Sequence, residues 1–458
     1  MPSGTHLTPR DRTDIGTLVR KVLPRQALGE WEAAEDRPDP VAQLLGQATN
    51  RLPHLVPIRH GRMSASAFAH FRGSAIVMAS DLASQADTGL TVQLCGDAHL
   101  ANFGMFASPE RTILFDLNDF DETHPGPFEW DVKRLAVSAV LSARSNGWGA
   151  SIQQELAEQA ASAYRVAIRN FAEMATLEVW YSRLDVSSLV SLAASLPSDK
   201  VLARVEKSIA GAKRRTNLQA QEKLTTVVDG KRQFAEDPPL LVRVTPEHAD
   251  LLAGDAMTQY RESLVSDRAA LLDQFRVVDV ARKVVGVGSV GTRCYVILLE
   301  GVDGQDPLML QFKEATASVL EPYTAPSEYG HHGARVVAGQ RLMQAATDIF
   351  IGWTSPTDGS TVHDSYVRQL RDMKFSPDLS ALEPPGLTIL LQAAGWTLAR
   401  AHARSGDRLA IGAYLGRSAR FEQAIAAWSM AYADQVEDDH AHLVQSIRMA
   451  KIQAITGL

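Results

Sequence analysis

Residues Cys95–Gly104 read CGDAHLANFG, and residues Phe115–Glu122 follow as FDLNDFDE. Two further segments lie far downstream: Val285–Thr292, VGVGSVGT, and Leu310–Ala315, LQFKEA. The first pair is rich in carboxylate and amide groups, whereas the second combines glycines with a lysine. An acidic loop that holds a metal and a glycine loop with a lysine are what phosphoryl transfer requires. In kinases the glycine loop comes first, so the order here is inverted.

The acidic segments contain a set of hard oxygen ligands. Asp97 and Asn102 are five residues apart on a segment that leaves a predicted strand, so one loop can offer a carboxylate to an acceptor hydroxyl and an amide oxygen to a metal. Magnesium prefers such oxygens, together with those of substrate phosphates. Capping of turns and of the next helix accounts for Asp131 and Glu122, but not for the whole cluster. The candidate metal ligands are Asn102, Asp116, Asp119 and Asp121.

Asp97 and His99 are the candidate catalytic residues. We expect Asp97 to orient or deprotonate a hydroxyl group. His99 has three possible roles: it orients the loop through hydrogen bonds, it ligates a metal, or it is a buried histidine with satisfied hydrogen bonds. We favour the orienting role.

The glycine segment favours a hairpin over a dinucleotide-binding turn. A dinucleotide-binding turn needs a helix directly after the third glycine. Instead, Gly291 precedes the β-branched and aromatic run Thr292–Leu299, and a second strand with Lys313 follows. An ordinary hairpin with an edge lysine is the competing interpretation. The candidate nucleotide-binding residues of this region are Gly286, Gly288, Ser289, Gly291 and Lys313.

A cationic cluster precedes the acidic loop. It comprises Arg59, His60, Arg62 and Arg72. One interpretation is recognition of a phosphorylated or carboxylated ligand, to which arginine is suited, and we include Arg62 and Arg72 among the cofactor-binding candidates. The other interpretation is ion pairing with the nearby acidic residues.

Composition narrows the class of protein. The chain has 458 residues, too many for one simple core, with ordinary hydrophobic (45%) and charged (22%) contents. A net charge of −7 argues against nucleic-acid binding. Two cysteines are too few for a disulfide framework, and no apolar run reaches membrane-spanning length. Because the N-terminal residues lack signal-peptide features, we expect a cytoplasmic protein without a membrane partner; its oligomeric state stays open.

Periodicity divides the chain into four parts, and the fold class is α+β. Residues 1–55 are expected to wrap the surface, and residues 56–275 to form a mostly helical lobe with the acidic loops. Residues 276–375 predict a small antiparallel β lobe that binds nucleotide, and residues 376–458 helices that complete the helical lobe. The expected strands of the β lobe are Val277–Val280, Cys294–Leu299, Leu308–Phe312 and Tyr366–Leu370, with one helix over Arg335–Ala346.

These motifs resemble the aminoglycoside- and choline-kinase-like branch of the protein-kinase-like superfamily. Leu398–Ala403, LARAHA, is similar to the helix that precedes the catalytic loop in those enzymes. The whole chain also resembles a bacterial family of unknown function, DUF2252, through the segments around Arg59–Met63, Phe71–Gly73, GDAH and NDFDE. The inverted motif order then implies a circularly permuted two-lobed kinase-like fold.

The resemblance implies an ATP- and Mg-dependent phosphotransferase that acts on a small-molecule or protein hydroxyl. Asp97 would be the catalytic base or the acidic residue that orients the hydroxyl, Asn102 a metal ligand, and Asp116 or Asp119 the chief magnesium ligand. The chain departs from the pattern because no glutamate on the Arg335–Ala346 helix can pair with Lys313; Gln340 is a neutral substitute. The alternatives are a nucleotide-binding pseudokinase, AMP transfer and, with less support, a two-metal phosphoesterase.

Overall fold

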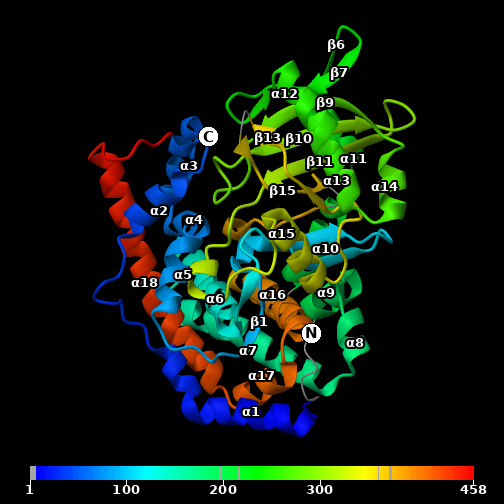
Figure 1. Ribbon diagram of the computed structural model, residues 1–458. Helices are drawn as coiled ribbons and strands as arrows, with labels where there is room; N and C mark the ends of the chain where they lie inside the picture. The colour runs from blue at the N-terminus through cyan, green and yellow to red at the C-terminus, as the bar shows by residue number, and fades with distance from the viewer. Residues whose placement is uncertain (1–6, 195–198, 215–216, 359–360, 371–373) are drawn as a thin grey trace.

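The computed structural model describes residues 7–458 except 195–198, 215–216, 359–360 and 371–373. A β-rich part lies at the top of Figure 1 and a larger helical part lies below it. The chain passes from the helical part into the β-rich part and returns, so each part contains distant stretches of sequence. The observed class is α+β, as the sequence predicts.

One six-stranded antiparallel sheet forms the β-rich part. Its strand order is β12-β15-β11-β10-β9-β8. The register places Lys313 opposite Cys294 on one neighbouring strand and opposite Tyr366 on the other. The strands are β8 (Leu241–Arg243), β9 (Arg276–Lys283), β10 (Cys294–Glu300), β11 (Pro307–Glu314), β12 (Gly352–Thr354) and β15 (Ser365–Gln369).

Both faces of this sheet are covered, which explains the uninterrupted apolar run of β10. Ile297 belongs to the core on one face, under α12–α14, and Val296 and Leu298 belong to the core on the other, under α11. The covering elements are α11 (Asn217–Leu224), α12 (Pro246–Leu251), the π-helical turn η4 (Leu252–Ala256), α13 (Met257–Ser263) and α14 (Ser266–Leu272). These elements precede residue 276, so the β-rich part begins earlier in the chain than the sequence patterns indicate.

The stretch before residue 275 also contains strands where helical patterning was expected. The hairpin β6 (Thr225–Val228) and β7 (Lys231–Phe234) precedes β8. Three of the four β6 residues are exposed, so the strand has no buried face and lacks the alternation that would identify it. One further short pair, later in the chain, is formed by β13 (Thr357–Asp358) and β14 (Thr361–Val362).

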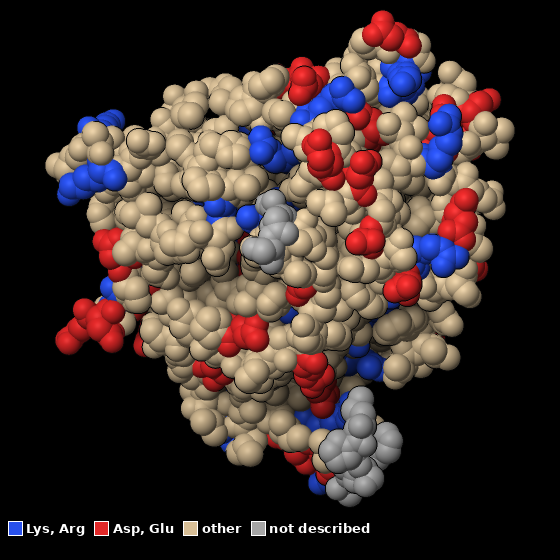
Figure 2. All heavy atoms as spheres, turned by 45° about the horizontal axis from the view of Figure 1, so that its top comes forward, with Lys and Arg blue, Asp and Glu red and all other residues tan. Residues whose placement is uncertain are grey.

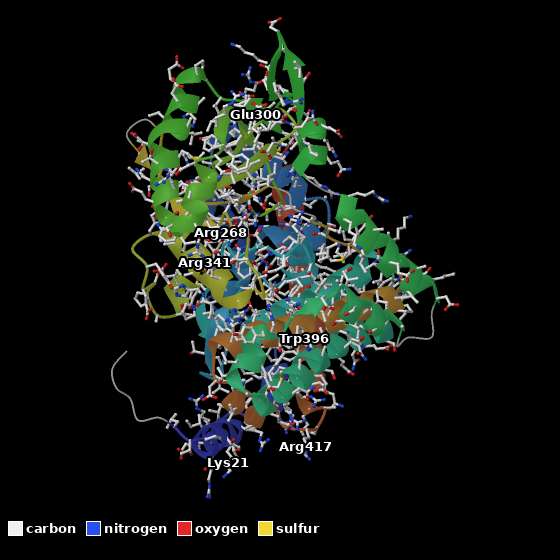
Figure 3. The ribbon with its side chains drawn as sticks, turned by 90° about the vertical axis from the view of Figure 1, so that its right-hand side faces the viewer. Lys21, Arg268, Glu300, Arg341, Trp396 and Arg417 are labelled. Atoms are coloured by element: carbon white, nitrogen blue, oxygen red, sulfur yellow. The ribbon has the colours of Figure 1, made fainter. Side chains whose placement is uncertain are left out.

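Two long helices form the centre of the helical part. Every residue of α6 (Phe128–Ser145) from Phe128 to Ala143 is buried. Helix α16 (Pro384–Ser405) packs against α6 and α7 (Ala150–Glu173), and Trp396 of α16 contacts Phe171 of α7. Figure 3 shows Trp396 well below Glu300 of the sheet and above Lys21 and Arg417. The C-terminal helices are α17 (Arg408–Leu415) and α18 (Arg420–Arg448).

The N-terminal segment contributes to this core as well as to the surface. Leu28, Val41 and Leu44 are buried, and α1 packs on α17. The elements are α1 (Pro9–Val22), η1 (Arg25–Gly29), α2 (Pro40–Ala48), η2 (Pro53–Leu55), α3 (Val56–Met63), α4 (Ala67–Gly73) and α5 (Ala75–Ala83). Helix α18 runs along this side of the molecule to α2 and α3, where the C-terminal end of the chain lies (Figure 1).

The acidic segments, Cys95–Gly104 and Phe115–Glu122, include or follow short strands that lie where the helical part meets the six-stranded sheet. Strand β1 pairs with β4, and β3 pairs with β2 and β5. The elements are β1 (Thr91–Leu94), η3 (Leu100–Asn102), β2 (Phe103–Ala107), β3 (Ile113–Leu117), β4 (His124–Pro127) and β5 (Leu184–Asp185). The remaining elements are α8 (Thr176–Tyr181), α9 (Val186–Ala194), α10 (Asp199–Arg214), η5 (Glu321–Tyr323), α15 (His332–Met343) and η6 (Leu379–Ala381).

The face in Figure 2 mixes charges of both signs. Lys and Arg side chains lie among Asp and Glu side chains, and neither sign forms a continuous field. A phosphate backbone requires a basic surface, which this face does not offer.

Candidate functional site

Asp131 of α6 holds the acidic loop, Cys95–Gly104, in place. Its carboxylate accepts hydrogen bonds from the backbone N–H groups of Cys95 (2.7 Å) and Gly96 (3.0 Å). His402 of α16 lies 3.3 Å from the same carboxylate. Gly96 has a φ of +79°, and an added Cβ would lie 2.3 Å from the Glu122 carbonyl oxygen, so only glycine fits here. Asp131 therefore anchors the loop, a role beyond the helix capping that the sequence suggests.

Asp97 faces the cavity with its carboxylate fixed by Arg134. Arg134 Nε donates to Asp97 Oδ1 at 2.5 Å, and Asn102 Nδ2 donates to the Asp97 carbonyl oxygen at 2.8 Å. The Asp97 side chain remains 22% exposed. Because Asn102 uses its amide nitrogen in this bond, its amide oxygen is left for another partner.

His99 lies behind Asp97 and is buried. Its Nε2 atom is 3.6 Å from Asp97 Oδ2. Burial lowers the pKa of His99 to about 4, against the opposing effect of Asp97, so the imidazole is neutral at neutral pH. A neutral ring beside the carboxylate can orient Asp97 without neutralising its charge.

The glycine loop joins β9 to β10 and is held by the N-terminal helical region. Arg51 Nη1 donates to the carbonyl oxygens of Gly288 (2.8 Å) and Val290 (2.6 Å). Arg62 Nη1 donates to the Gly286 carbonyl oxygen at 2.5 Å. Gly291 has a φ of +91°, which favours glycine. Arg62 thus supports the loop from outside the cavity.

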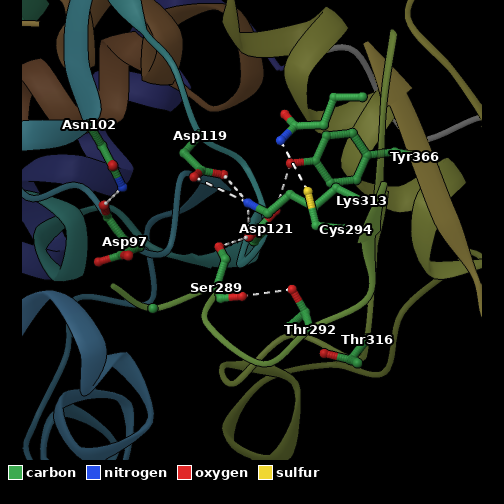
Figure 4. Close-up of polar contacts among 12 residues, drawn as sticks. Asp97, Asn102, Asp119, Asp121, Ser289, Thr292, Cys294, Lys313, Thr316 and Tyr366 are labelled. Carbon is green, nitrogen blue, oxygen red and sulfur yellow. Dashed lines mark hydrogen bonds and ion pairs between the residues drawn. The ribbon is translucent and has the colours of Figure 1, made fainter. Parts of the chain in front are cut away.

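Lys313 joins the sheet to the acidic segment (Figure 4). Its Nζ atom lies 3.4 Å from both carboxylate oxygens of Asp119 and forms an ion pair with Asp121. Tyr366 donates to Asp121 Oδ1 at 2.8 Å, and Ser289 of the glycine loop donates to Asp121 Oδ2 at 3.3 Å. The glycine loop, the lysine and two acidic residues are therefore in direct contact.

The two carboxylates differ in their electrostatic environments. Burial alone would raise the pKa of Asp119, but Lys313 and Arg368 hold it below its ordinary value. Burial and the neighbouring Asp119 raise the pKa of Asp121. The pKa of Lys313 lies well above its ordinary value because Asp119 and Asp121 outweigh the effect of burial. Asp119 is thus the more firmly ionised of the two acids.

Asp116 lies outside this cluster. Its carboxylate accepts from Arg400 Nη2 at 2.7 and 2.9 Å and from the Ala345 N–H at 2.8 Å, and the residue is 1% exposed. The ion pair ties β3 to α16. Of the two aspartates that sequence spacing offers as the chief metal ligand, Asp119 faces the cavity and Asp116 does not.

One cavity collects residues from five regions of the chain. It is lined by residues of the α2–α5 region, the acidic loop, the Asp119–Glu122 turn, the glycine loop and Glu314–Thr316. The candidates that line it are Arg72, Asp97, His99, Asn102, Asp119, Asp121, Gly286, Gly288 and Ser289. Lys313 is 2% exposed and reaches Asp119 and Asp121 from behind.

Four residues with roles in this site were not identified from the sequence: Arg51, Glu122, Arg134 and Tyr366. No sequence pattern identified Arg134 as a site residue. Because all faces of α6 are buried, its hydrophobic periodicity cannot show which turn of the helix faces the acidic loop. Tyr366 could have been found from strand pairing, since it lies opposite Lys313. Glu122 closes the NDFDE segment and lines the cavity.

The donor set fits a magnesium ion that is shared with a substrate. Within the described ranges, no three His, Cys, Asp or Glu side chains gather closely enough to hold a metal ion by themselves. Asp119 and Asp121 supply two carboxylates and Asn102 an amide oxygen. Magnesium is commonly bound by one or two carboxylates plus phosphate oxygens, so these residues suit that ion only together with a phosphate ligand.

Comparison with known proteins gives a family without an assigned function. No curated protein and no solved structure matches the chain. None of the helices in the described part of the chain has the length and apolar character that crossing a bilayer requires. Residues 51–446 match the family described as "Uncharacterized protein conserved in bacteria (DUF2252)", and this range includes every candidate site residue predicted from the sequence. The chain therefore belongs to the bacterial family DUF2252.

Proposed function

We propose that this protein is an ATP- and magnesium-dependent phosphotransferase with a circularly permuted, two-lobed kinase-like fold. One observation carries the proposal: Lys313 Nζ lies 3.4 Å from both carboxylate oxygens of Asp119, 194 residues away in sequence, beside the glycine loop. A lysine, a metal-binding acid and a glycine loop are the elements that hold a nucleoside triphosphate in kinases.

Each element has a chemical task in this proposal. Backbone N–H groups of Gly286–Ser289 would bind phosphate oxygens, and the Lys313 ammonium would offset their charge. Asp119, Asp121 and Asn102 would hold magnesium, which supplies positive charge to the triphosphate.

Asp97 would receive the proton of the acceptor hydroxyl. The acceptor oxygen forms a bond to the γ-phosphorus, and the bond from that phosphorus to the β–γ bridging oxygen breaks. The products are the phosphorylated acceptor and ADP, and the proton moves to the Asp97 carboxylate. Arg134 keeps this carboxylate aimed at the cavity, because it occupies Oδ1 and leaves Oδ2 beside the neutral His99.

The end of α16 supports the permuted order. In the kinase-like pattern the helix similar to Leu398–Ala403 leads directly into the catalytic loop. Here the N–H of Gln93 on β1 donates to the Ser405 hydroxyl at 3.1 Å, so the end of α16 lies beside the strand that leads into Cys95–Gly104. Reading from β9 through α16 and then from β1 onward restores the usual sequence of motifs.

A nucleotide-binding regulatory module is the second candidate. It is favoured by the partners of Lys313, which are Asp119 and Asp121 and not a helical glutamate. Gln340 of α15 donates to Gln344 and does not replace that glutamate. AMP transfer would use the same reactants. A two-metal phosphoesterase would need further Asn or His ligands beside Asp119, Asp121 and Asn102.

Product analysis with ATP and magnesium tests the proposal. A mixture of small hydroxyl compounds and proteins serves as acceptor, and ADP, phosphate, AMP and pyrophosphate are quantified. We expect ADP and a phosphorylated product from the native protein. AMP attached to the acceptor would indicate nucleotidyl transfer, and nucleotide binding without turnover would indicate the regulatory module.

A matched pair of lysine variants tests whether Lys313 contacts the nucleotide. Lys313→Met should weaken ATP binding by about tenfold or more, since it removes a buried charge that would contact phosphate. Lys231→Met changes an exposed lysine of β7 and should bind ATP as the native protein does. A native protein that binds no ATP, or two variants with equal affinity, would overturn the assignment.

A further inference from the structure

Within the described part of the chain, Arg59 is a buried cation without an ionic partner. It lies on α3 and is 0% exposed. Its Nη2 atom donates to Gln47 Oε1 (2.6 Å) and to the Gly73 carbonyl oxygen (2.8 Å). Its Nε and Nη1 atoms have no hydrogen-bond partner, although the residue lines the cavity. Burial, with Arg51 nearby, lowers the pKa of Arg59.

Arg72 of α4 repeats this feature in the same cavity. It lines the cavity, and its Nε atom has no hydrogen-bond partner. Across the described residues, no carboxylate lies within 4.0 Å of the guanidinium groups of Arg59 or Arg72. We define these two side chains as the arginine pair.

The acidic residues of the cavity are already occupied by other groups. Asp97 pairs with Arg134, and Asp119 and Asp121 pair with Lys313. Glu122 accepts from the Val319 N–H, and Glu314 pairs with Arg293 and His363. Burial lowers the pKa of Arg72, and Asp97 and Asp119 partly oppose this effect at longer range without forming an ion pair with it. Each acidic residue of the cavity has a closer partner elsewhere in the described part of the chain, so the guanidinium groups of the arginine pair are left without a direct counter-charge there.

The arginine pair lies beside the proposed nucleotide site. The glycine loop and Lys313 come from the β-rich part, whereas Arg59 and Arg72 come from α3 and α4, and the Arg72 carbonyl oxygen lies against Gly288 of the glycine loop. Gln47 and Asn50 also line it and add polar side chains. Burying unpaired guanidinium groups is unfavourable unless an anion joins them, and a guanidinium fork matches the oxygens of phosphate and carboxylate.

We propose that Arg59 and Arg72 form an oxyanion subsite for the acceptor, so that the hydroxyl compound presented to Asp97 carries a phosphate or carboxylate group. That the bound anion belongs to an acceptor depends on the proposed phosphotransferase function. The existence of the anion subsite does not.

Calorimetric titration with inorganic phosphate tests the subsite. Titrations are made without nucleotide and again with saturating magnesium and a non-hydrolysable ATP analogue. Native protein should bind phosphate in both conditions, and Arg72→Gln should weaken binding at least tenfold. Arg268→Gln, a change of a partly exposed arginine on α14, is the matched control and should bind as the native protein does. Acetate in place of phosphate distinguishes a carboxylate from a phosphate group.

The outcomes separate this inference from the proposed function. No phosphate or acetate binding by native protein, or equal affinity in Arg72→Gln and Arg268→Gln, would overturn the subsite. Displacement of phosphate by the analogue would also overturn it, because the arginines would then hold phosphates of the nucleotide. Phosphate binding without analogue binding would instead refute the nucleotide site and retain the anion subsite. Arg59→Gln adds a second test. The result for Arg72→Gln is decisive, since Arg72 is less buried and its side chain makes no hydrogen bond or ion pair with another described residue.

Discussion

The carboxylate of Asp97 has one strong partner, the guanidinium of Arg134 at 2.5 Å. Asp97→Asn keeps the shape of the side chain but removes its ability to accept a proton. If Asp97 is the base, transfer should slow by about 10²–10⁴-fold while ATP affinity stays within a few-fold of native. Rates under saturating ATP, together with equilibrium nucleotide binding, measure both quantities.

A matched control separates this effect from loss of structure. Asp303→Asn alters an exposed turn after β10 and should leave the rate unchanged. Urea unfolding of both variants shows whether the unpaired Arg134 destabilises the protein. A native rate in folded Asp97→Asn would exclude Asp97 as the base.

The raised pKa of Glu122 predicts how the stability of the protein depends on pH. Burial raises the pKa of Glu122 to about 7, although the Val319 N–H and Arg335 oppose the effect. The ordinary value is 4.5, so between about pH 4.5 and 7 the folded state holds a proton that the unfolded state has lost. The free energy of unfolding should therefore decrease as pH rises through this window, by about 1–3 kcal/mol from this group.

Urea unfolding at pH 5 and pH 8 measures this dependence. Glu122→Gln cannot ionise and should reduce the difference between the two pH values, whereas Glu328→Gln, at an exposed position, should keep it. Identical pH dependence in native protein and Glu122→Gln would show that Glu122 is not the responsible group.

At the scale of elements, α6 and α16 together position the acidic loop. Asp131 accepts from two loop N–H groups, and Tyr164 of α7 forms a 2.9 Å hydrogen bond with His402, which contacts Asp131. Asp131→Ala leaves two buried donors without an acceptor and should lower the free energy of unfolding by about 2–4 kcal/mol.

The conservative variant tests whether the hydrogen bonds are the cause. Asp131→Asn retains one carbonyl oxygen and should be clearly less destabilised than Asp131→Ala. Chemical denaturation of both variants gives the comparison. Equal losses would mean that the negative charge, and not the loop hydrogen bonds, accounts for the stability.

Strand prediction succeeded where the pattern was strong. The strand expected directly before the Asp97 segment is β1 (Thr91–Leu94), and the four strands expected in the β-rich part correspond to β9, β10, β11 and β15. The expected helix is α15, three residues earlier at each end. β6, β7 and β8 were missed because short strands with exposed faces have no periodic signal.

At the scale of the whole molecule, the helical core is built from both ends of the chain. Helix α16 packs against α6 and α7, and α18 packs against the same two helices. We therefore expect that fragments 1–229 and 230–458, cut in the β6–β7 turn at Asp229 and Gly230, fold together but not separately. Both turn residues have positive φ angles and lie in an exposed hairpin that can tolerate a cut.

Co-expression of the two fragments, with a purification tag on one of them, tests whether they fold together. The two fragments should co-purify in equal amounts and give the circular dichroism spectrum of the intact protein, whereas each alone should aggregate. A fragment 230–458 that is soluble and cooperatively folded by itself would contradict a shared core.

Residue types and motif spacing were enough to select Asp97, Asn102, Asp119 and Lys313 as candidates, but not to predict how they are arranged. The phosphate chemistry assigned to them stays a proposal. Spacing alone could not separate Asp116 from Asp119, because the choice depends on Arg400, which is 284 residues away in sequence. Long-range ion pairs of this kind are set by packing, which a single sequence does not record.

The hydrogen bond from Arg62 to the glycine loop has a practical consequence for protein production. Arg62 Nε also donates to the carbonyl oxygen of Leu458 at 3.0 Å, and Ile455 bonds to Pro57. A purification tag attached at Leu458 would therefore begin next to the arginine that supports Gly286. Samples for ligand-binding work are better tagged before α1, which lies at the far end of the molecule from the C-terminal end in Figure 1.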